Sequence, residues 1–387
     1  MKTTLRSLRL VLFESVLTAG ILSIPIMTPF FLDLGLNQAE IALTQTCFTV
    51  AMIVLNIPLG WVADRFSRKW ANIIGDFGMV AVFWLYSGVQ GFAGIVVAEI
   101  LCAACMAFSQ GVDSSLLKHF SSKLGRSEKD FKILSGRLSA WQFVVSGIFL
   151  ALGGPIGAID FRLAIVLSGV PFLIGGIISL FIVDDSEKLI PQHKNPLKDM
   201  GRVVNDAVKN PALRWRLFAY AVSQKYTNVM VWVFTPLMLL VKVPLELVAI
   251  GWVLNYCTGA LGSLLAKKIA PRLKDWQNFL LPILFASVSF GALSIHLSIW
   301  TIWLYGLTGL CWGYSSAALM PMILEKSKPS EHTSVISLAK VVGQLLYIPT
   351  VWLVGIAADI KLEYSMLATL LIFIPLAVPI LVKLRRE

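Results

Sequence analysis

Apolar stretches long enough to cross a lipid bilayer recur from one end of this 387-residue chain to the other. Each crossing of the hydrocarbon core requires ~20 residues in a helix. The composition agrees, because 57% of the residues are hydrophobic and 14% are charged, whereas soluble domains carry roughly 25% charged residues. The short alternating segments of a transmembrane β-barrel are not seen. The sequence therefore predicts an all-α polytopic membrane protein.

The distribution of Lys and Arg predicts the topology. The predicted spans cover roughly residues 10–32, 41–62, 71–88, 93–116, 134–158, 163–183, 215–240, 246–266, 278–296, 299–323, 334–357 and 365–382. Of the 33 Lys and Arg residues, 28 fall on the side of the N-terminus, and Arg162, Lys242 and Lys361 fall on the other side. The remaining two, Lys225 and Lys340, lie inside spans. Cytoplasmic loops carry such an excess, so we expect twelve spans with both termini cytoplasmic. The net charge of +11 then reflects topology, and no nucleic-acid partner is expected.

The longest polar segment, residues 184–214, divides the spans into six and six. We therefore predict an N-terminal six-helix half over 1–183, a cytoplasmic linker over 184–214 and a C-terminal six-helix half over 215–387. The stretches "CMAFSQGVDSSLL" and "CWGYSSAALMPMI" match weakly at a constant offset between the halves. Such internal symmetry is typical of a duplicated bundle.

The predicted turn between the second and third spans carries the pattern G-x-x-x-D-R-x-x-R-K. Gly60 allows a neighbouring helix to approach closely. Asp64 is a carboxylate that can interact with a helix N-terminus or with an arginine. Arg65, Arg68 and Lys69 anchor the turn at the cytoplasmic surface. A simple end of a span would explain the basic residues but neither the glycine nor the aspartate.

This pattern closely resembles the loop 2–3 signature of the major facilitator superfamily, although Ser67 replaces the usual glycine. The resemblance implies two six-helix halves and a cluster that latches them together on the cytoplasmic side. The stretch "GGPIG" (153–157) resembles the end of a motif found in antiporters of that superfamily, which favours export. At position 99, glutamate replaces an arginine that many members carry, so we expect no coupling through that arginine.

Ionisable residues inside spans are costly and usually mark function. Six are predicted there: Glu14, Asp76, Glu99, Asp113, Lys225 and Lys340. Asp113 is expected to pair with Arg65 or Arg68, and Asp76 to lie near Lys69. Helical spacing places further substrate or proton pathway candidates on the faces of four spans: Glu99 with Gln110, Lys225 with Asn228, Trp312, and Lys340 with Gln344 and Tyr347. In the superfamily, the first, fourth, seventh and tenth helices line the central cavity.

Lys225 is expected near the midplane of the bilayer. It would contact an anionic group of a substrate, or form one half of an ion pair that breaks and forms as a proton is bound and released. Glu99 is the predicted proton carrier, and Glu14 is the alternative.

The sequence thus predicts a secondary active transporter that exports a small amphipathic or hydrophobic organic compound in exchange for protons. Two alternatives are an uptake symporter for a small organic anion and a non-transporting sensor or lipid-handling protein. No nucleophile–base pair, metal-ligand set or phosphate-binding loop is found, so no enzyme, cofactor or metal is predicted. The expected partners are the substrate, protons and the lipid bilayer. The protein is expected to be a monomer in a prokaryotic-type inner (plasma) membrane.

Overall fold

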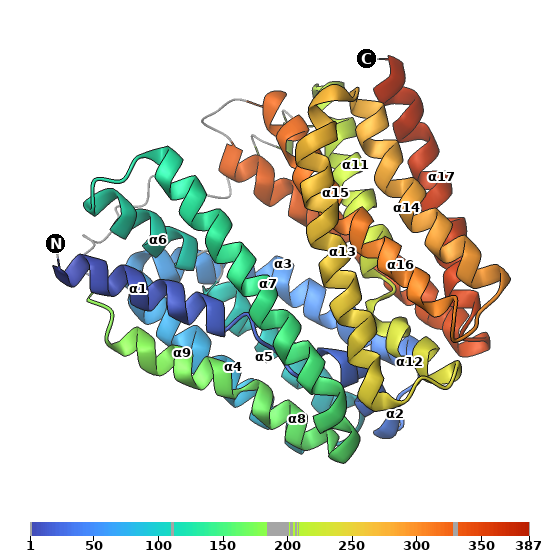
Figure 1. Ribbon diagram of the computed structural model, residues 1–387, viewed down its shortest axis with the longest axis horizontal. Coiled ribbons are helices and arrows are strands. Elements are labelled where there is room, and N and C mark those ends of the chain that lie inside the picture. Colours follow the sequence, from blue (N-terminus) through green and yellow to red (C-terminus); the bar gives the residue numbers. More distant parts are fainter. Residues whose placement is uncertain are drawn as a thin grey trace. The chain divides into compact units, whose positions relative to one another are not determined.

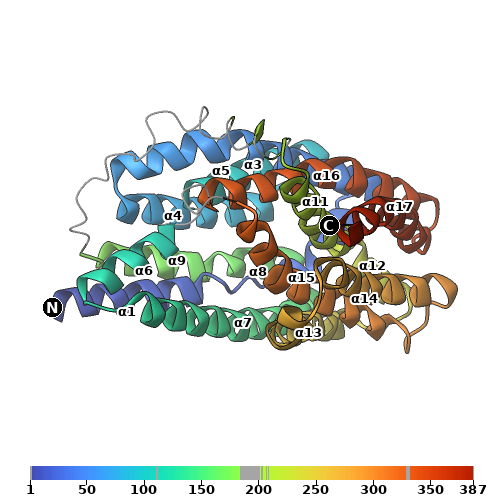
Figure 2. The ribbon, with the colours of Figure 1, turned by 90° about the horizontal axis from the view of Figure 1, so that it is seen from above.

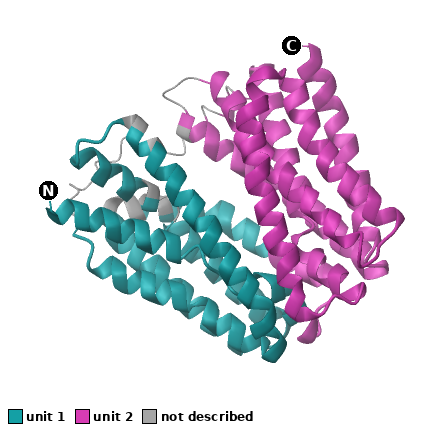
Figure 3. Ribbon diagram, viewed as in Figure 1, with its two compact units in different colours: residues 1–30, 47–194 teal, residues 31–46, 195–387 magenta. Residues whose placement is uncertain are grey.

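The computed structural model describes residues 2–109, 112–183, 201, 204–205, 207, 209–327 and 332–386. It does not describe the side chains of residues 57, 60–61, 63–66, 114, 128–129, 132 and 333. Helices are the only regular secondary structure in the described residues. The chain divides into two compact units (Figure 3), the first containing residues 1–30 and 47–194 and the second residues 31–46 and 195–387.

The first unit is a bundle of antiparallel helices. Its helices are α1 (Lys2–Leu17), η1 (Ile24–Ile26), most of α3 (Gln38–Phe66), α4 (Arg68–Gly88), α5 (Gly91–Ser109), α6 (Val112–Lys123), α7 (Glu128–Ile159), α8 (Phe161–Ser168) and α9 (Val170–Leu180). Helix α1 packs against α6, α7 and α9, and α4 packs against α5, α8 and α9 (Figures 1 and 2). The apolar faces of α1 and α6 meet in a cluster that buries Leu8, Val11, Leu116 and Phe120.

The second unit is also helical. It contains the end of α2 (Met27–Asp33) and the start of α3, followed by α11 (Pro211–Asn228), α12 (Val231–Leu240), η2 (Leu245–Leu247), α13 (Val248–Ile269), η3 (Ala270–Arg272), α14 (Asp275–Ile295), η4 (Ile302–Tyr305), α15 (Gly306–Glu325), α16 (His332–Ile360) and α17 (Tyr364–Arg386). Helices α13 and α15 pack most closely. A Cβ atom on Gly313 would lie 1.8 Å from the Gly259 carbonyl oxygen, so the two backbones meet where only glycine fits.

Each predicted span overlaps an observed helical segment, and the order along the chain is the same. Nine of the helices in the described part of the chain are long and apolar enough to cross a membrane. The predicted span 10–32 is wrong as a continuous helix, because α1 ends at Leu17 and helix resumes at Ile24. Pro25 lies in the first turn of η1, where its missing N–H costs nothing, but the same residue could not continue α1. The predicted spans 163–183 and 215–240 are likewise interrupted, the first between α8 and α9 and the second between α11 and α12.

The interruptions after α1 and after α11 each follow an ionisable residue. Glu14 lies in the last turn of α1, where its carbonyl oxygen accepts a bond of 2.9 Å from the Thr18 N–H. Lys225 lies in the last turn of α11, where its carbonyl oxygen accepts a bond of 3.2 Å from the Val229 N–H. Each unit therefore carries a titratable side chain where its helix stops.

Residues 31–46 precede the predicted linker in sequence but pack within the second unit. Asp359 of α16 accepts hydrogen bonds from the Gln38 N–H (2.7 Å) and the Ala39 N–H (2.9 Å) at the start of α3. A Cβ atom on Gly355 would lie 2.8 Å from the Gln38 carbonyl oxygen. The start of α3 is thus held directly against α16. Most of the predicted linker lies outside the described residues, namely 184–200, 202–203, 206 and 208, and its boundaries stay a prediction.

Candidate functional site

The glycine–aspartate–arginine pattern was expected on a turn, but it covers the end of α3 and the start of α4, which Ser67 separates. The side chains of Gly60, Asp64 and Arg65 lie outside the described residues. Arg68 donates from Nη1 to the carbonyl oxygen of Ser115 at 3.5 Å, and Lys69 donates from Nζ to that of Leu180 at 2.7 Å. The described basic residues thus fix the start of α4 to α6 and α9. The role of Asp64 as a latch stays a prediction.

Three carboxyl groups of the first unit meet in its interior. Glu14 of α1 is 1% exposed and Asp76 of α4 is 5% exposed, and Asp113 lies in the first turn of α6. The Glu14 and Asp76 side chains both lie beside Gly175 of α9, where a Cβ atom would be 3.2 Å from Asp76 Oδ2 and 3.5 Å from Glu14 Cγ. We call these three residues the carboxylate cluster. The sequence indicated each of them separately, and the fold brings them together.

Polar side chains surround the carboxylate cluster. The Ser15 hydroxyl donates to Glu14 Oε2 at 3.4 Å, and the Asn72 side chain also bonds Glu14. Asn72 Nδ2 donates in addition to Ser179 Oγ at 3.1 Å, which ties the cluster to α9. The sequence analysis missed Asn72 and Ser179, although an uncharged polar residue inside a predicted span is a signal that could have found them.

Glu99 contacts a tyrosine of the neighbouring helix. It is 4% exposed on α5, and its carboxyl group hydrogen-bonds the phenol of Tyr86 on α4. Gln110, predicted on the same face, lies outside the described residues. Met106, which helical spacing also places on that face, is 43% exposed. The buried face of α5 therefore contains Glu99 and Ala103 but not Met106.

In the second unit, Lys225 contacts an aromatic side chain. Its Nζ lies 4.9 Å from the centre of the Tyr347 ring, a cation–π distance. The Tyr347 hydroxyl accepts a hydrogen bond of 3.2 Å from Trp232 Nε1, and the Trp232 ring stacks on Phe31 at 6.1 Å. Among the described residues, no carboxylate lies within ion-pair distance of Lys225. The ammonium is therefore held by an aromatic face and not by an opposite charge.

A second polar group lies on the neighbouring residue. Gln224 Nε2 donates to Ser315 Oγ at 2.9 Å and to Ser316 Oγ at 2.8 Å on α15. In the same part of α15, Trp312 packs on Tyr256 with ring centres 5.9 Å apart. We call Gln224, Lys225, Trp232, Trp312 and Tyr347 the aromatic–amide surface. Gln224 was missed in the sequence, where its position inside the polar stretch "SQKYTN" of a span could have indicated it.

The remaining predicted pathway residues of the second unit are less enclosed. Asn228 and Lys340 are exposed and Gln344 is half-buried. Their helices, α11 and α16, are the ones that also carry Lys225 and Tyr347. The structure thus brings Lys225 into contact with Tyr347, whereas Asn228 and Lys340 are exposed and Gln344 is half-buried.

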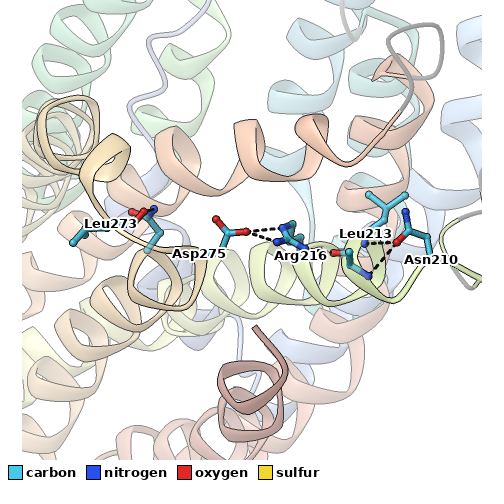
Figure 4. A network of polar contacts seen from close by, with 7 residues as sticks. Asn210, Leu213, Arg216, Leu273 and Asp275 are labelled. Atoms are coloured by element: carbon cyan, nitrogen blue, oxygen red, sulfur yellow. Dashed lines mark hydrogen bonds and ion pairs between the residues drawn. The ribbon is translucent and has the colours of Figure 1, made fainter. Parts of the chain in front are cut away.

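The beginning of α11 is fixed by an ion pair (Figure 4). The Asn210 side chain accepts hydrogen bonds from the backbone N–H groups of Ala212 and Leu213, which caps the helix. The Arg216 guanidinium pairs with Asp275 at the start of α14, with a distance of 2.8 Å from Nε to Oδ2. Arg216 is 5% exposed. Nε and Nη2 of Arg216 both bond the same oxygen, Asp275 Oδ2, and this pair orients α11 and therefore the residues of the aromatic–amide surface that it carries.

Comparison with known proteins identifies the family. The model of the Major Facilitator Superfamily matches residues 11–350. The chain belongs to this superfamily. It is therefore a multi-pass membrane transport protein and not an enzyme, with a small-molecule substrate. No curated protein matches the chain in sequence.

Solved structures of two superfamily transporters share the fold. The nucleoside transporter NupG superposes with a TM-score of 0.82 at 12% identity, covering 99% of both chains. A bacterial homologue of the human lysosomal transporter Spinster superposes with a TM-score of 0.77 at 14% identity, covering 99% of this chain and 96% of its own. At these identities the likeness shows the fold of the superfamily and not a substrate.

In a superfamily transporter the two sites suit different chemistry. The carboxylate cluster offers oxygen atoms that can take up or release protons. The aromatic–amide surface offers a cation, an amide and ring faces, which can bind an organic molecule that has both apolar and polar parts.

Proposed function

We propose that the protein exports a small amphipathic organic compound by alternating access and that a proton gradient drives this export. In this proposal it is a monomer in a prokaryotic-type inner membrane with both termini in the cytoplasm. The excess of Lys and Arg on one side supports the orientation, and the resemblance of "GGPIG" (153–157) to an antiporter motif supports the direction.

The aromatic–amide surface is the observation that carries the substrate class. Ligand sites are lined mainly by apolar and aromatic groups with few polar groups that fix orientation. Trp232, Trp312 and Tyr347 supply ring faces, whereas Gln224 and Lys225 supply a donor and a charge. Such a surface suits a compound with an apolar body and a polar end.

The interrupted helices are consistent with a site whose backbone changes conformation during transport. Interrupted transmembrane helices are a recurring feature of substrate and ion sites in transporters. Glu14 and Lys225 lie immediately before the interruptions in α1 and α11. A change of charge at either residue would therefore act where the backbone can change direction.

A second candidate function is uptake of a small organic anion. It is favoured by Lys225, whose ammonium contacts the Tyr347 ring and has no carboxylate partner among the described residues. A positive charge held in this way is available to a carboxylate or phosphate group of a substrate. In this alternative, anion and proton would enter together.

Transport into and out of proteoliposomes tests these two functions. The panel would contain amphipathic cations, neutral amphipathic compounds and small organic anions. Nucleosides belong in it as well, because NupG is a nucleoside transporter. We expect an outward-directed flux of an amphipathic compound that increases with an opposing proton gradient. Inward flux of an anion that increases with a parallel gradient would favour the second function. No gradient-dependent flux of any class would contradict both.

A further inference from the structure

We propose that Arg272, Lys274, Trp276 and Arg385, which we call the basic–tryptophan site, bind the phosphodiester head group of an anionic phospholipid. These residues belong to the second unit and lie where α13 leads into α14 and where α17 ends. The inference goes beyond the proposed function, because a lipid that binds from the bilayer depends neither on the transported compound nor on the direction of transport.

The start of α14 and the end of α17 lie together at one end of the second unit. Helices α14 and α17 pack side by side (Figure 1). The guanidinium carbon of Arg385 lies 5.7 Å from the centre of the Trp276 ring, a cation–π distance. Both helices are long and apolar enough to cross a membrane, so this contact is located where two spans reach the membrane surface. Tryptophan is enriched at that level.

The turn that carries the other two basic residues of the site is held in one conformation. Asn278 Nδ2 donates to the carbonyl oxygens of Ala270 at 3.1 Å and of Leu273 at 3.3 Å. The Tyr314 hydroxyl donates to Asn278 Oδ1 at 2.6 Å, which fixes the amide from the other side. The turn is therefore folded against the first turns of α14, and a ligand that binds there does not have to order it.

The positive charge of the site is not compensated by the protein. Its three basic side chains are exposed and form no ion pair among the described residues. The sequence has no acidic residue over 247–274 or over 364–386. Asp275, at the start of α14, already pairs with Arg216. Such a group of cations suits a phosphodiester, since an arginine can bind two phosphate oxygens at once.

The surface next to Arg385 favours a lipid over a soluble anion. Leu371, Ile374 and Val378 are exposed, and helical spacing places them on the same face of α17 as Arg385. Arg385 follows Val378 by about 10 Å along the helix. An anionic phospholipid can lay an acyl chain along this apolar stripe and place its phosphate at the arginine, whereas a soluble anion would leave the stripe uncovered.

The positive-inside rule explains part of this pattern but not all of it. An excess of Lys and Arg on one side is sufficient to set the topology. Topology alone does not require an arginine held against a tryptophan ring or a turn fixed by a buried amide. Basic residues at the membrane surface also attract anionic lipids, and these two contacts turn that general attraction into a defined site.

Lipid binding to the purified full-length protein tests the proposal. Native mass spectrometry would measure the affinity for phosphatidylglycerol, with phosphatidylcholine of the same acyl chains as the reference. Arg272→Gln/Arg385→Gln should weaken the binding of the first phosphatidylglycerol about 25-fold, at roughly fivefold for each basic residue, and should leave phosphatidylcholine unaffected. Arg6→Gln/Arg9→Gln is the matched control, because it removes two exposed arginines of α1 and should leave the affinity within about twofold of wild type.

A second variant keeps the net charge. Trp276→Leu should weaken the binding of phosphatidylglycerol severalfold, because Arg385 loses the ring that holds it. This variant also provides the test if the double variant folds poorly.

Three results would overturn the proposal. An equal loss in the test pair and in the control pair would show only a general attraction to basic surface. Equal affinity of wild type for phosphatidylglycerol and phosphatidylcholine would show that the head group is not recognised. Displacement of phosphatidylglycerol by inorganic phosphate at the same concentration would make this a site for soluble anions.

Discussion

Removal of the Asp359 carboxylate should release the start of α3 from α16. The carboxylate accepts from the Gln38 and Ala39 N–H groups at 2.7 and 2.9 Å. Hydrogen bonds to a charged group contribute about 1.5–3 kcal/mol in favourable settings, but Asp359 is exposed and water can replace it. Loss of an N-cap acceptor costs ~1 kcal/mol. We therefore expect Asp359→Ala to destabilise the docked arrangement by about 1 kcal/mol, a roughly fivefold change in population.

Distances between spin labels on residues 33 and 367 measure this change. Both positions are exposed, and Cys257 must be replaced because it is the exposed native cysteine. Asp359→Ala should increase the fraction of long distances about fivefold, as that energy implies. Glu363→Gln is the control, because its exposed pair with Lys361 (3.2 Å) contributes little. A distribution that is the same in wild type and in Asp359→Ala would refute the reasoning.

Four other changes have defined outcomes. Lys225→Met should weaken the binding of anionic compounds roughly 5- to 150-fold, because a contact of about 1–3 kcal/mol is lost. The binding of neutral compounds should not be weakened. An equal loss of affinity for anionic and neutral compounds in an equilibrium binding assay would contradict this. Asp64→Asn should leave membrane insertion intact but change the populations of the two transport states, and unchanged label distances would exclude the latch. Gly313→Ala should lower stability by about 1–3 kcal/mol in thermal unfolding, because α13 must move; an unchanged unfolding temperature would disprove close packing. Hydrogen bonds from Ser127 hold the pKa of Asp130 below its usual value. The stability that this cap gives α7 is therefore present above the ordinary aspartate pKa and is lost as the pH falls through the lowered pKa of Asp130. Ser127→Ala should move this loss of stability to higher pH, and an unchanged pH dependence would show that Ser127 does not lower the pKa of Asp130.

The helical architecture could be predicted because length and apolarity decide whether a segment can cross a bilayer. The interruptions could not be predicted with the same ease. Pro25 follows the first interruption in the sequence, but a proline in a membrane helix can also produce only a bend. No proline stands at residues 229–230, where α11 gives way to α12, so proline does not account for that interruption.

The candidate sites were predictable residue by residue but not as groups. Glu14, Asp76 and Asp113 were found because a charge inside a span is costly. Their meeting depends on how α1, α4 and α6 pack, and helical spacing within one span carries no information about that. Lys225 and Tyr347 were likewise found separately on two spans. Their cation–π contact follows from the packing of α11 on α16.

The central proposal is that a proton gradient drives export, and it is tested most directly by measuring gradient-driven flux and exchange at equal pH separately. Wild type and Asp76→Asn would be reconstituted with the transported compound on both sides, with and without an imposed pH gradient. We expect Asp76→Asn to retain exchange at equal pH within about twofold of wild type and to lose gradient-driven accumulation. Wild type without gradient-driven accumulation would contradict the proposal, and full accumulation by Asp76→Asn, Asp113→Asn and Glu14→Gln would make Glu99 the carboxyl group to test.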